Sequence, residues 1–238
     1  MNLSSEEIAR YQRQIALPQF GEEAQAALKR GRVLVIGAGG LGCPTLLYLA
    51  AAGVGRITAL DAERVEISNL QRQVLFTTAD AAAGAQKAVV AARRLRELNP
   101  LIEIEGRTER FSEGNGVALT AAHDVVVDAS DNFETRYAVN DACVKAGKPF
   151  VQGTIRGVEG RVSVFNWRGG ATYRDLFPQA GANEVRPAVL GAVCGMTGAV
   201  MAGEVIKLLT EIGEPLSGKV WIWDVMRAEG RVLKMGKG

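Results

Sequence analysis

The sequence predicts an α/β fold: a Rossmann-like, doubly wound and mostly parallel sheet with helices on both faces, extended by C-terminal antiparallel strands. Three observations predict it. Short apolar strands alternate with helical segments up to about residue 153. A glycine-rich turn, "GAGGLG" at 37–42, separates the first of these strands from a helix. After residue 153 the alternation stops, and 160–167 has the pattern of an antiparallel strand.

The first 153 residues are expected to form two N-terminal helices (1–31) and a nucleotide-binding core (32–153). Ser4 and Glu7 have the spacing of a capping box, and 22–30 is expected to form the second helix. Glycines or a proline end the core helices. The expected core strands are 32–36, 56–61, 102–106, 124–130 and 149–153, and the expected core helices are 41–53, 85–99 and 133–147.

The remaining residues, 154–238, are expected to extend the same domain, so that 1–238 is one domain. The expected elements are a strand at 160–167, a helix at 191–212 and two short strands at 219–225 and 231–235. Residues 168–188 show no period and contain two prolines. We interpret them as a crossover loop over a site, because long structureless loops in compact domains are often functional. A disordered insertion is the alternative.

Composition excludes several classes of function. The net charge of +2 suggests neither a nucleic-acid groove nor an anionic membrane surface. The polar N-terminus has no signal-peptide core, and glycine or charge interrupts every long apolar stretch. Cys43, Cys143 and Cys194 are widely spaced, which favours a reducing cytoplasm. The single histidine, His123, is expected to be a surface or boundary residue, so histidine catalysis is not expected.

The glycine turn predicts a nucleotide site. Glycines allow a tight turn and let backbone amides approach a phosphate at a helix N-terminus. The four are Gly37, Gly39, Gly40 and Gly42. Asp61 follows the second strand, 19 residues after Gly42, where a carboxylate suits a ribose. NAD and ATP both remain open here, and NAD is the commoner ligand of such a turn.

Residues beyond Asp61 favour ATP. The segment 61–76 carries amide and cationic side chains, namely Asn69, Gln71, Arg72 and Gln73. Arg72 can pair with phosphate oxygens, and Lys87 can add a charge to the same group. Asp131, past the strand at 124–130, suits a magnesium ion beside a triphosphate. Surface ion pairs are the competing interpretation for any one of these residues.

Five stretches together resemble the ThiF/MoeB/HesA adenylyltransferases, relatives of the ubiquitin-activating enzymes. They are "RYQRQI", "GAGGLG", "GVGRITALDAERVEISNLQRQVLF", "GAQKA" and "DASDNFETRYAVND". The resemblance runs in order from about residue 10 to 227. It implies ATP-dependent adenylylation of the C-terminal glycine carboxylate of a small ubiquitin-like sulfur-carrier protein (ThiS/MoaD-like) that ends in Gly-Gly. Pyrophosphate is released, and the carrier serves sulfur transfer in thiamine or molybdopterin-type biosynthesis.

The resemblance also implies the site residues. Gly40 lies on the phosphates and Asp61 on the ribose, Asp131 holds Mg²⁺, and Arg13 is supplied across a homodimer interface. The implied catalytic residues are Arg13, Asn69, Arg72, Lys87 and Asp131. The implied nucleotide-binding residues are Gly37, Gly39, Gly40, Gly42, Asp61, Ser68, Asn69, Gln71, Arg72, Lys87, Asp131 and Asn132. The attacking carboxylate is already a nucleophile, so no general base is needed.

The chain departs from the family at its cysteines. Many members hold a structural zinc with two CxxC pairs, but Thr172 and Asp175 stand at the first pair and the sequence has only three cysteines. We therefore expect ATP and Mg²⁺ as cofactors and no zinc. Glu184 stands where some members have a loop cysteine, and Cys194 is expected to pack as a small buried residue. No sulfurtransferase domain is expected after the last strands, so that partner should be a separate protein.

Three other functions remain open from the sequence. One is adenylylation of another carboxylate, such as a peptide C-terminus or a transfer-RNA-linked amino acid. Another is a non-catalytic module that binds a carrier without using ATP, against which the complete set of catalytic residues argues. The third is a dehydrogenase. A cytoplasmic homodimer with no nucleic-acid or membrane partner is expected in the leading case.

Overall fold

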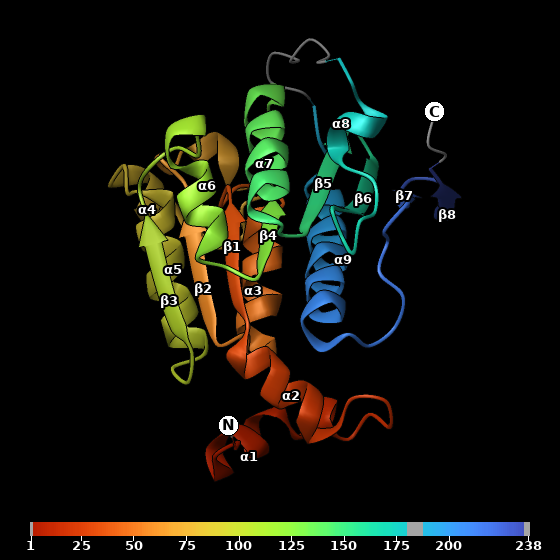
Figure 1. Ribbon diagram of the computed structural model, residues 1–238. Coiled ribbons are helices and arrows are strands. Elements are labelled where there is room, and N and C mark those ends of the chain that lie inside the picture. Colours follow the sequence, from red (N-terminus) through yellow and green to blue (C-terminus); the bar gives the residue numbers. More distant parts are fainter. Residues whose placement is uncertain (1, 180–187, 236–238) are drawn as a thin grey trace.

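The computed structural model describes residues 2–179 and 188–235. Eight strands form one sheet in the order β3-β2-β1-β4-β5-β6-β7-β8 (Figure 1). The strands are β1 (Arg32–Ile36), β2 (Arg56–Leu60), β3 (Glu103–Arg107), β4 (Val125–Asp128), β5 (Phe150–Arg156), β6 (Glu159–Phe165), β7 (Lys219–Asp224) and β8 (Glu229–Lys234). The helices are α1 (Ser5–Ile15), α2 (Gly21–Arg30), α3 (Gly42–Ala52), the 3₁₀ turn η1 (Ile67–Asn69), α4 (Thr78–Ala82), α5 (Lys87–Leu98), α6 (Glu113–Ala121), α7 (Phe133–Ala146), α8 (Tyr173–Leu176) and α9 (Gly191–Thr210).

The sheet has a parallel half and an antiparallel half. Strand β1 pairs in parallel with β2 and β4, which pair in parallel with β3 and β5. Strands β5 to β8 pair antiparallel in chain order. The chain therefore reverses its direction of winding between β1 and β4, where ligands of such sheets bind at the carboxyl ends of the strands. The predicted fold class is confirmed.

Strand alternation divides the apolar side chains between two cores. Val33 and Val35 of β1 join a core beneath α3, α5 and α9, whereas Leu34 and Ile36 face a second core beneath α6 and α7. Successive strand residues point to opposite faces, so a run of apolar residues is buried on both. This explains why the central strands contain continuous apolar sequence.

The two N-terminal helices lie at the amino ends of the parallel strands, at the bottom of Figure 1. The predicted capping box is present, because Ser4 accepts a hydrogen bond from the Glu7 backbone N–H and its own N–H donates to the Glu7 carboxylate. Buried Tyr11 anchors α1, and its hydroxyl accepts a 2.8 Å hydrogen bond from Asn99. Since the carboxyl ends of the strands point up in Figure 1, α1 lies at the edge opposite the glycine turn.

The segment predicted as a loop at 168–188 contains a helical turn, α8, which the sequence prediction missed. A complete capping box starts it: the Thr172 hydroxyl accepts from the Asp175 N–H, and the Asp175 carboxylate accepts from the Thr172 N–H at 2.7 Å. Buried Tyr173 stacks edge-on against Tyr137 and Phe165, which ties the turn to the second core. The predicted counterpart of the loop cysteine, Glu184, lies outside the described residues.

His123 corrects another expectation. It is 5% exposed rather than at the surface. One ring nitrogen lies 2.7 Å from the Leu119 carbonyl and the other 2.9 Å from the Thr58 hydroxyl, so both find partners inside the protein. Burial lowers the pKa of His123 and favours the neutral ring.

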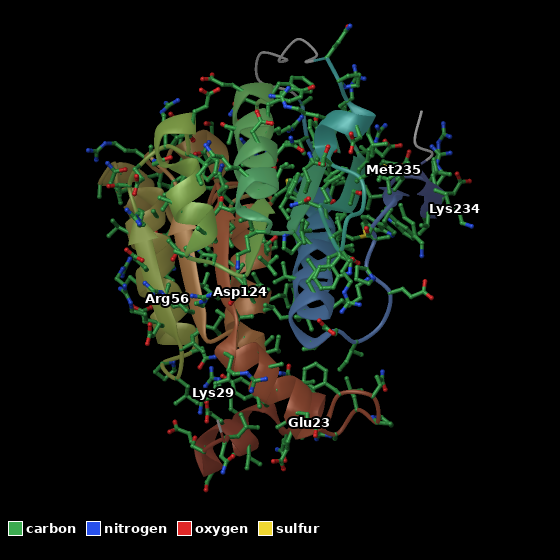
Figure 2. All side chains as sticks on the ribbon, viewed as in Figure 1. Glu23, Lys29, Arg56, Asp124, Lys234 and Met235 are labelled. Atoms are coloured by element: carbon green, nitrogen blue, oxygen red, sulfur yellow. The ribbon has the colours of Figure 1, made fainter. Side chains whose placement is uncertain are left out.

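Among the described residues, one helix is long and apolar enough to cross a membrane, namely α9. Half of it is buried inside the protein, where it packs against α3, β5 and β6, so it has the character of a core helix. The two edge strands of the sheet are β3 and β8. The residues of β8 are exposed, and Figure 2 shows Lys234 and Met235 at this end of the molecule.

Candidate active site

The glycine turn is too tight for any other residue at two of its positions. Gly37 has a φ of 92°, and a Cβ there would lie 2.9 Å from the Ala129 carbonyl oxygen. A Cβ on Gly42 would lie 1.9 Å from the Gly37 carbonyl oxygen. The turn therefore joins β1 to α3 by the shortest path and rests against the chain that leaves β4.

The N-terminus of α3, which follows this turn, has no side-chain cap. Uncapped backbone N–H groups at a helix start attract anions. Beside them, a Cβ on Gly40 would lie 3.5 Å from the Arg72 side chain and 3.0 Å from the Cys194 sulfur. The predicted phosphate contact at Gly40 and the predicted phosphate-binding Arg72 are thus neighbours.

Asp61, directly after β2, binds the glycine turn as well as being available for a ribose. Its carboxylate accepts hydrogen bonds of 2.8 Å from the backbone N–H groups of Ala38 and Glu63. Burial raises the pKa of Asp61, and these two N–H donors act against that effect. The residue as a whole is 9% exposed, so the carboxylate lies almost buried beside the turn.

Lys87, at the first position of α5, points into the same region. It is 3% exposed, and its ammonium forms a 2.7 Å ion pair with Glu63, whose side chain is 64% exposed. Asp61 lies close enough for the Lys87 charge to favour its ionised form. The structure therefore brings Lys87 to the ribose side of the glycine turn, with an acidic partner that the sequence analysis did not single out.

The segment 66–73 lies beside the glycine turn and is held by hydrogen bonds within itself. The Asn69 side chain accepts a 3.3 Å hydrogen bond from the Glu66 N–H and caps η1. Arg72 donates 3.1 Å to the Ser68 carbonyl, which holds the guanidinium near Gly40. Gln71 is exposed, and a Cβ on Gly191, at the start of α9, would lie 2.1 Å from the Gln71 carbonyl oxygen.

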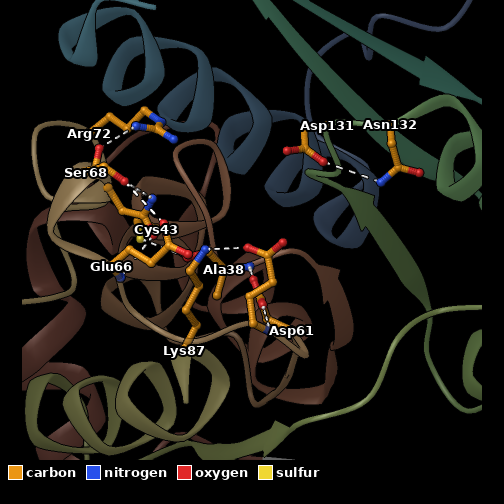
Figure 3. Close-up of polar contacts among 11 residues, drawn as sticks. Ala38, Cys43, Asp61, Glu66, Ser68, Arg72, Lys87, Asp131 and Asn132 are labelled. Carbon is orange, nitrogen blue, oxygen red and sulfur yellow. Dashed lines mark hydrogen bonds and ion pairs between the residues drawn. The ribbon is translucent and has the colours of Figure 1, made fainter. Parts of the chain in front are cut away.

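Asp131 and Asn132 lie on the other side of the turn, at the carboxyl end of β4 (Figure 3). Asn132 caps α7 by accepting a 2.9 Å hydrogen bond from the Thr135 N–H. Asp131 is exposed and accepts one long hydrogen bond, 3.4 Å, from Asn132. Figure 3 shows this pair apart from Asp61, Lys87 and Arg72, so the predicted nucleotide-binding residues lie on two sides of the turn.

The donor set at Asp131 fits magnesium carried by a nucleotide. Within 2–179 and 188–235, no group of three or more His, Cys, Asp or Glu side chains could hold a metal ion. Magnesium commonly keeps several waters and takes one or two carboxylates together with substrate phosphates. A single exposed carboxylate, Asp131, beside a turn that is predicted to bind phosphate meets that requirement.

Arg13 is the one predicted catalytic residue that the structure separates from the others. It lies exposed in the last turn of α1, at the amino-end edge of the sheet. Its guanidinium forms no hydrogen bond or ion pair with the part of the chain that the structure describes. Within one chain α1 therefore holds Arg13 at the edge of the sheet opposite the glycine turn.

All three cysteines are buried, as the sequence predicted for their packing. Burial raises the pKa of Cys43 to about 12. Burial also raises the pKa of Cys194 to about 11, although the nearby Arg72 charge acts in the opposite direction. These thiols are therefore protonated and poorly nucleophilic near neutral pH.

Four groups of the site were not predicted from the sequence. Two are the Ala38 N–H and Glu63, and two are Asp128 and Ser130 beneath Asp131. Glu63 stands two residues after Asp61, a spacing that could have suggested it. Asp128 ends an apolar strand segment, where a carboxylate is a signal of function that sequence reasoning could have used.

The fold and the site together define a nucleotide-binding α/β domain. A model of the ThiF family matches residues 11–237. The chain belongs to the ThiF family.

Two curated relatives are similar over nearly the whole chain. The "Sulfur carrier protein adenylyltransferase" of Thermus thermophilus is 46% identical and aligns with 98% of this chain and 89% of its own length. The "Probable adenylyltransferase/sulfurtransferase MoeZ" of Mycobacterium tuberculosis is also 46% identical, over 99% of this chain but only 62% of its own length.

Solved structures agree with the fold. A crystal structure of E. coli MccB with MccA-N7isoASN superposes with a TM-score of 0.83 at 25% identity, covering 100% of this chain and 74% of that chain. Identity at this level supports the architecture more than any residue role.

Proposed function

We propose that the protein adenylylates the C-terminal glycine carboxylate of a small ubiquitin-like sulfur-carrier protein ending in Gly-Gly, with Mg·ATP as the second substrate. The observation that carries the proposal is the convergence of Asp61, Arg72 and Lys87 on an uncapped glycine turn, with Asp131 across it. The name of the Thermus relative supports the substrate class, because that relative matches along 89% of its length.

The reaction needs phosphate charge to be neutralised rather than a proton to be moved. A carboxylate oxygen of the carrier attacks the α-phosphorus of ATP, the bond to the bridging oxygen of the β-phosphate breaks, and pyrophosphate leaves. Asp61 orients the ribose, while Arg72 and Lys87 hold the phosphates. Magnesium, which Asp131 would hold, supplies further positive charge on the phosphates.

Lys87 reaches the phosphates by exchanging partners. In the structure its ammonium is paired with Glu63. Glu63 is largely exposed and gains water when it is released, so the exchange to a phosphate costs little solvation. The buried stem of Lys87 keeps the ammonium in place throughout.

Pyrophosphate exchange tests the proposal. We expect wild-type protein with candidate carriers ending in Gly-Gly to incorporate labelled pyrophosphate into ATP, and carriers that lack the terminal glycine to be inactive. Calorimetry should detect binding of Mg·ATP and no comparable binding of NAD. Tighter binding of NAD than of Mg·ATP would contradict the proposal, as would the absence of exchange with every carrier.

The active form in this proposal is a homodimer in which Arg13 of one chain completes the site of the other. Two observations support it: α1 places Arg13 at the edge of the sheet opposite the glycine turn of its own chain, and α3 and α9 expose apolar side chains. Tyr48 on α3 is 57% exposed, and Met196 on α9 is partly exposed. A second copy could cover this surface.

The same proposal includes a cytoplasmic protein without structural zinc that works with a separate sulfurtransferase. The free, buried cysteines support a reducing compartment. The capping box of Thr172 and Asp175, at the place of the first zinc pair in the family, supports a fold that stands without the metal.

A further inference from the structure

The buried carboxylate of Asp128, at the last position of β4, has no role in the mechanism above. The residue is 1% exposed. One of its oxygens, Oδ1, accepts hydrogen bonds from Ser130, at 3.1 Å from the backbone N–H and 2.6 Å from the hydroxyl. The two bonds close the chain on itself just after the strand and fix the direction in which it leaves β4.

Helix α7 holds the same turn from outside. Arg136 approaches the Ser130 carbonyl at 3.5 Å, and its guanidinium stacks 5.1 Å from the centre of the Phe133 ring. The Asn132 side chain caps α7 at the Thr135 N–H. Asp131 therefore stands between two fixed points, the closed turn before it and the helix start after it.

The turn also rests on the glycine turn. The Ala129 N–H donates a 3.0 Å hydrogen bond to the Ile36 carbonyl, at the end of β1. The Ala129 carbonyl is the atom that a Cβ on Gly37 would meet at 2.9 Å. Through this contact the position of Asp131 is coupled to the turn on which the phosphates would lie.

The other carboxylate oxygen of Asp128, Oδ2, lowers the stability of the folded protein. Asp128 Oδ2 is buried and has no hydrogen-bond partner among the described residues. Gln152, its neighbour in register on β5, has a buried side-chain N–H₂ group that also lacks one there. A buried carboxylate with one unpaired oxygen lowers stability, and such costs accumulate where function demands a geometry.

We propose that Asp128 is a positioning residue for magnesium: by closing the 128–131 turn, it aims Asp131 at a metal ion carried by the phosphates above the glycine turn. The inference rests on the proposed function for the identity of the ligand, a magnesium nucleotide. It assigns Asp128 no contact with the metal or the substrate.

The test separates affinity for magnesium from affinity for the nucleotide. Binding of the non-hydrolysable analogue AMPCPP is measured by calorimetry over a series of Mg²⁺ concentrations, and again in EDTA. Asp128→Ala should raise the Mg²⁺ concentration for half-maximal enhancement by about tenfold or more, the usual effect of removing a group that orients a metal ligand. Its affinity for AMPCPP in EDTA should remain that of the wild type.

Two further variants distinguish positioning from charge and from folding. Asp128→Asn should stay within about threefold of the wild type, because an amide oxygen accepts the same two hydrogen bonds. Ser130→Ala, which removes the shorter bond and keeps the carboxylate, should shift the Mg²⁺ dependence in the direction of Asp128→Ala. Asp124→Ala, just before the other end of β4 where its carboxylate pairs with Arg32, is the matched control and should not shift it.

The inference is overturned if Asp128→Asn is as defective as Asp128→Ala, if Ser130→Ala leaves the Mg²⁺ dependence unchanged, or if affinity in EDTA falls in parallel. Pyrophosphate exchange on the same samples keeps the two proposals apart. A wild type that binds Mg·AMPCPP but catalyses no exchange refutes the proposed function alone. A wild type that does not bind Mg·AMPCPP refutes both.

Discussion

The carboxylate of Asp61 accepts a 2.8 Å hydrogen bond from the backbone N–H of Ala38 and so ties the end of β2 to the glycine turn after β1. A residue expected to bind the ribose therefore also shapes the turn expected to bind the phosphates. The ribose and the phosphates of the nucleotide would therefore bind to residues that are hydrogen-bonded to each other.

Asp61→Ala should weaken nucleotide binding by roughly tenfold or more, because hydrogen bonds to charged groups contribute about 1.5–3 kcal/mol each. Calorimetry with Mg·ATP measures the effect. Glu63→Ala is the control: it leaves the backbone N–H that Asp61 accepts and removes only the exposed partner of Lys87. A loss in Glu63→Ala as large as that in Asp61→Ala would contradict a specific contribution of the Asp61 carboxylate to nucleotide binding.

Activity should be recovered by mixing two inactive chains, Arg13→Ala and Asp131→Ala. Each mixed dimer has one site with Asp131 from one chain and Arg13 from the other. After random subunit exchange about a quarter of wild-type exchange activity is expected, since half the dimers are mixed and each has one intact site. No recovery, with exchange of subunits verified by mass spectrometry, would argue against the shared site.

Cys194→Ser should leave adenylation intact, although Cys194 lies beside Gly40. Burial raises the pKa of this thiol to about 11, so it is a poor nucleophile for the carrier adenylate at pH 7. The exchange rate and the intact mass after incubation with carrier and ATP provide the measurement. A thioester adduct on the wild type that disappears in the variant would show a reactive thiol instead.

The capping box at Thr172 should stabilise the segment that a structural zinc ion holds in many members of the family. Purified protein is expected to contain no stoichiometric zinc by elemental analysis and to resist chelators. Thr172→Ala should cost about 1 kcal/mol, the usual value of an N-cap, and make 168–179 more sensitive to protease. Thr77→Ala removes the equivalent box at α4 and should leave 168–179 resistant. One zinc per chain would contradict the prediction.

The stability of the protein should depend on pH through Asp128. Burial raises its pKa above the ordinary 3.8, against the effects of Ser130 and Arg136, so the folded state disfavours the charged form. The stability that the protonated form of Asp128 contributes to the folded state is therefore lost as the pH rises through the raised pKa. The melting temperature of Asp128→Asn minus that of the wild type should therefore increase from about pH 4 to pH 7.

Asp124→Asn is the control with the opposite sign. Burial acts to raise the pKa of Asp124, but the hydrogen bonds and charge of Arg32 outweigh it and lower the pKa. Its contribution is present above the unfolded pKa and lost as pH falls, so the variant should become relatively less stable as pH rises. The same trend in both variants would contradict the assignment of Asp128.

Much of this architecture could be predicted, because the central strands are buried on both faces and leave apolar runs in the sequence. Helices α4 and α6 could not: α4 is a single turn, and α6 contains two glycines that weaken the helical pattern. The ends of the strands were also where the sequence placed the candidate nucleotide-binding residues, and the roles of those residues stay predictions. The closed turn of Asp128 was missed because its burial depends on α7, which packs over it only in the folded chain.

One expectation, the surface position of His123, was wrong, and another, the role of Arg13, concerns a second chain. His123 was expected near the surface, but its ring satisfies both nitrogens inside the protein, which no local pattern reveals. The proposed role of Arg13 requires a second chain, and Arg13 is exposed in the single chain.

Strand β5 pairs in parallel with β4 and antiparallel with β6, and α9 packs on both β5 and β6. The boundary drawn at residue 153 therefore falls inside a strand shared by the two halves of the sheet. Neither half can lose its structure without exposing the apolar face of the other, so heating should produce one cooperative transition. All three tryptophans, Trp167, Trp221 and Trp223, lie beyond that boundary. Their fluorescence should follow the same melting curve as the far-ultraviolet circular dichroism of the whole chain.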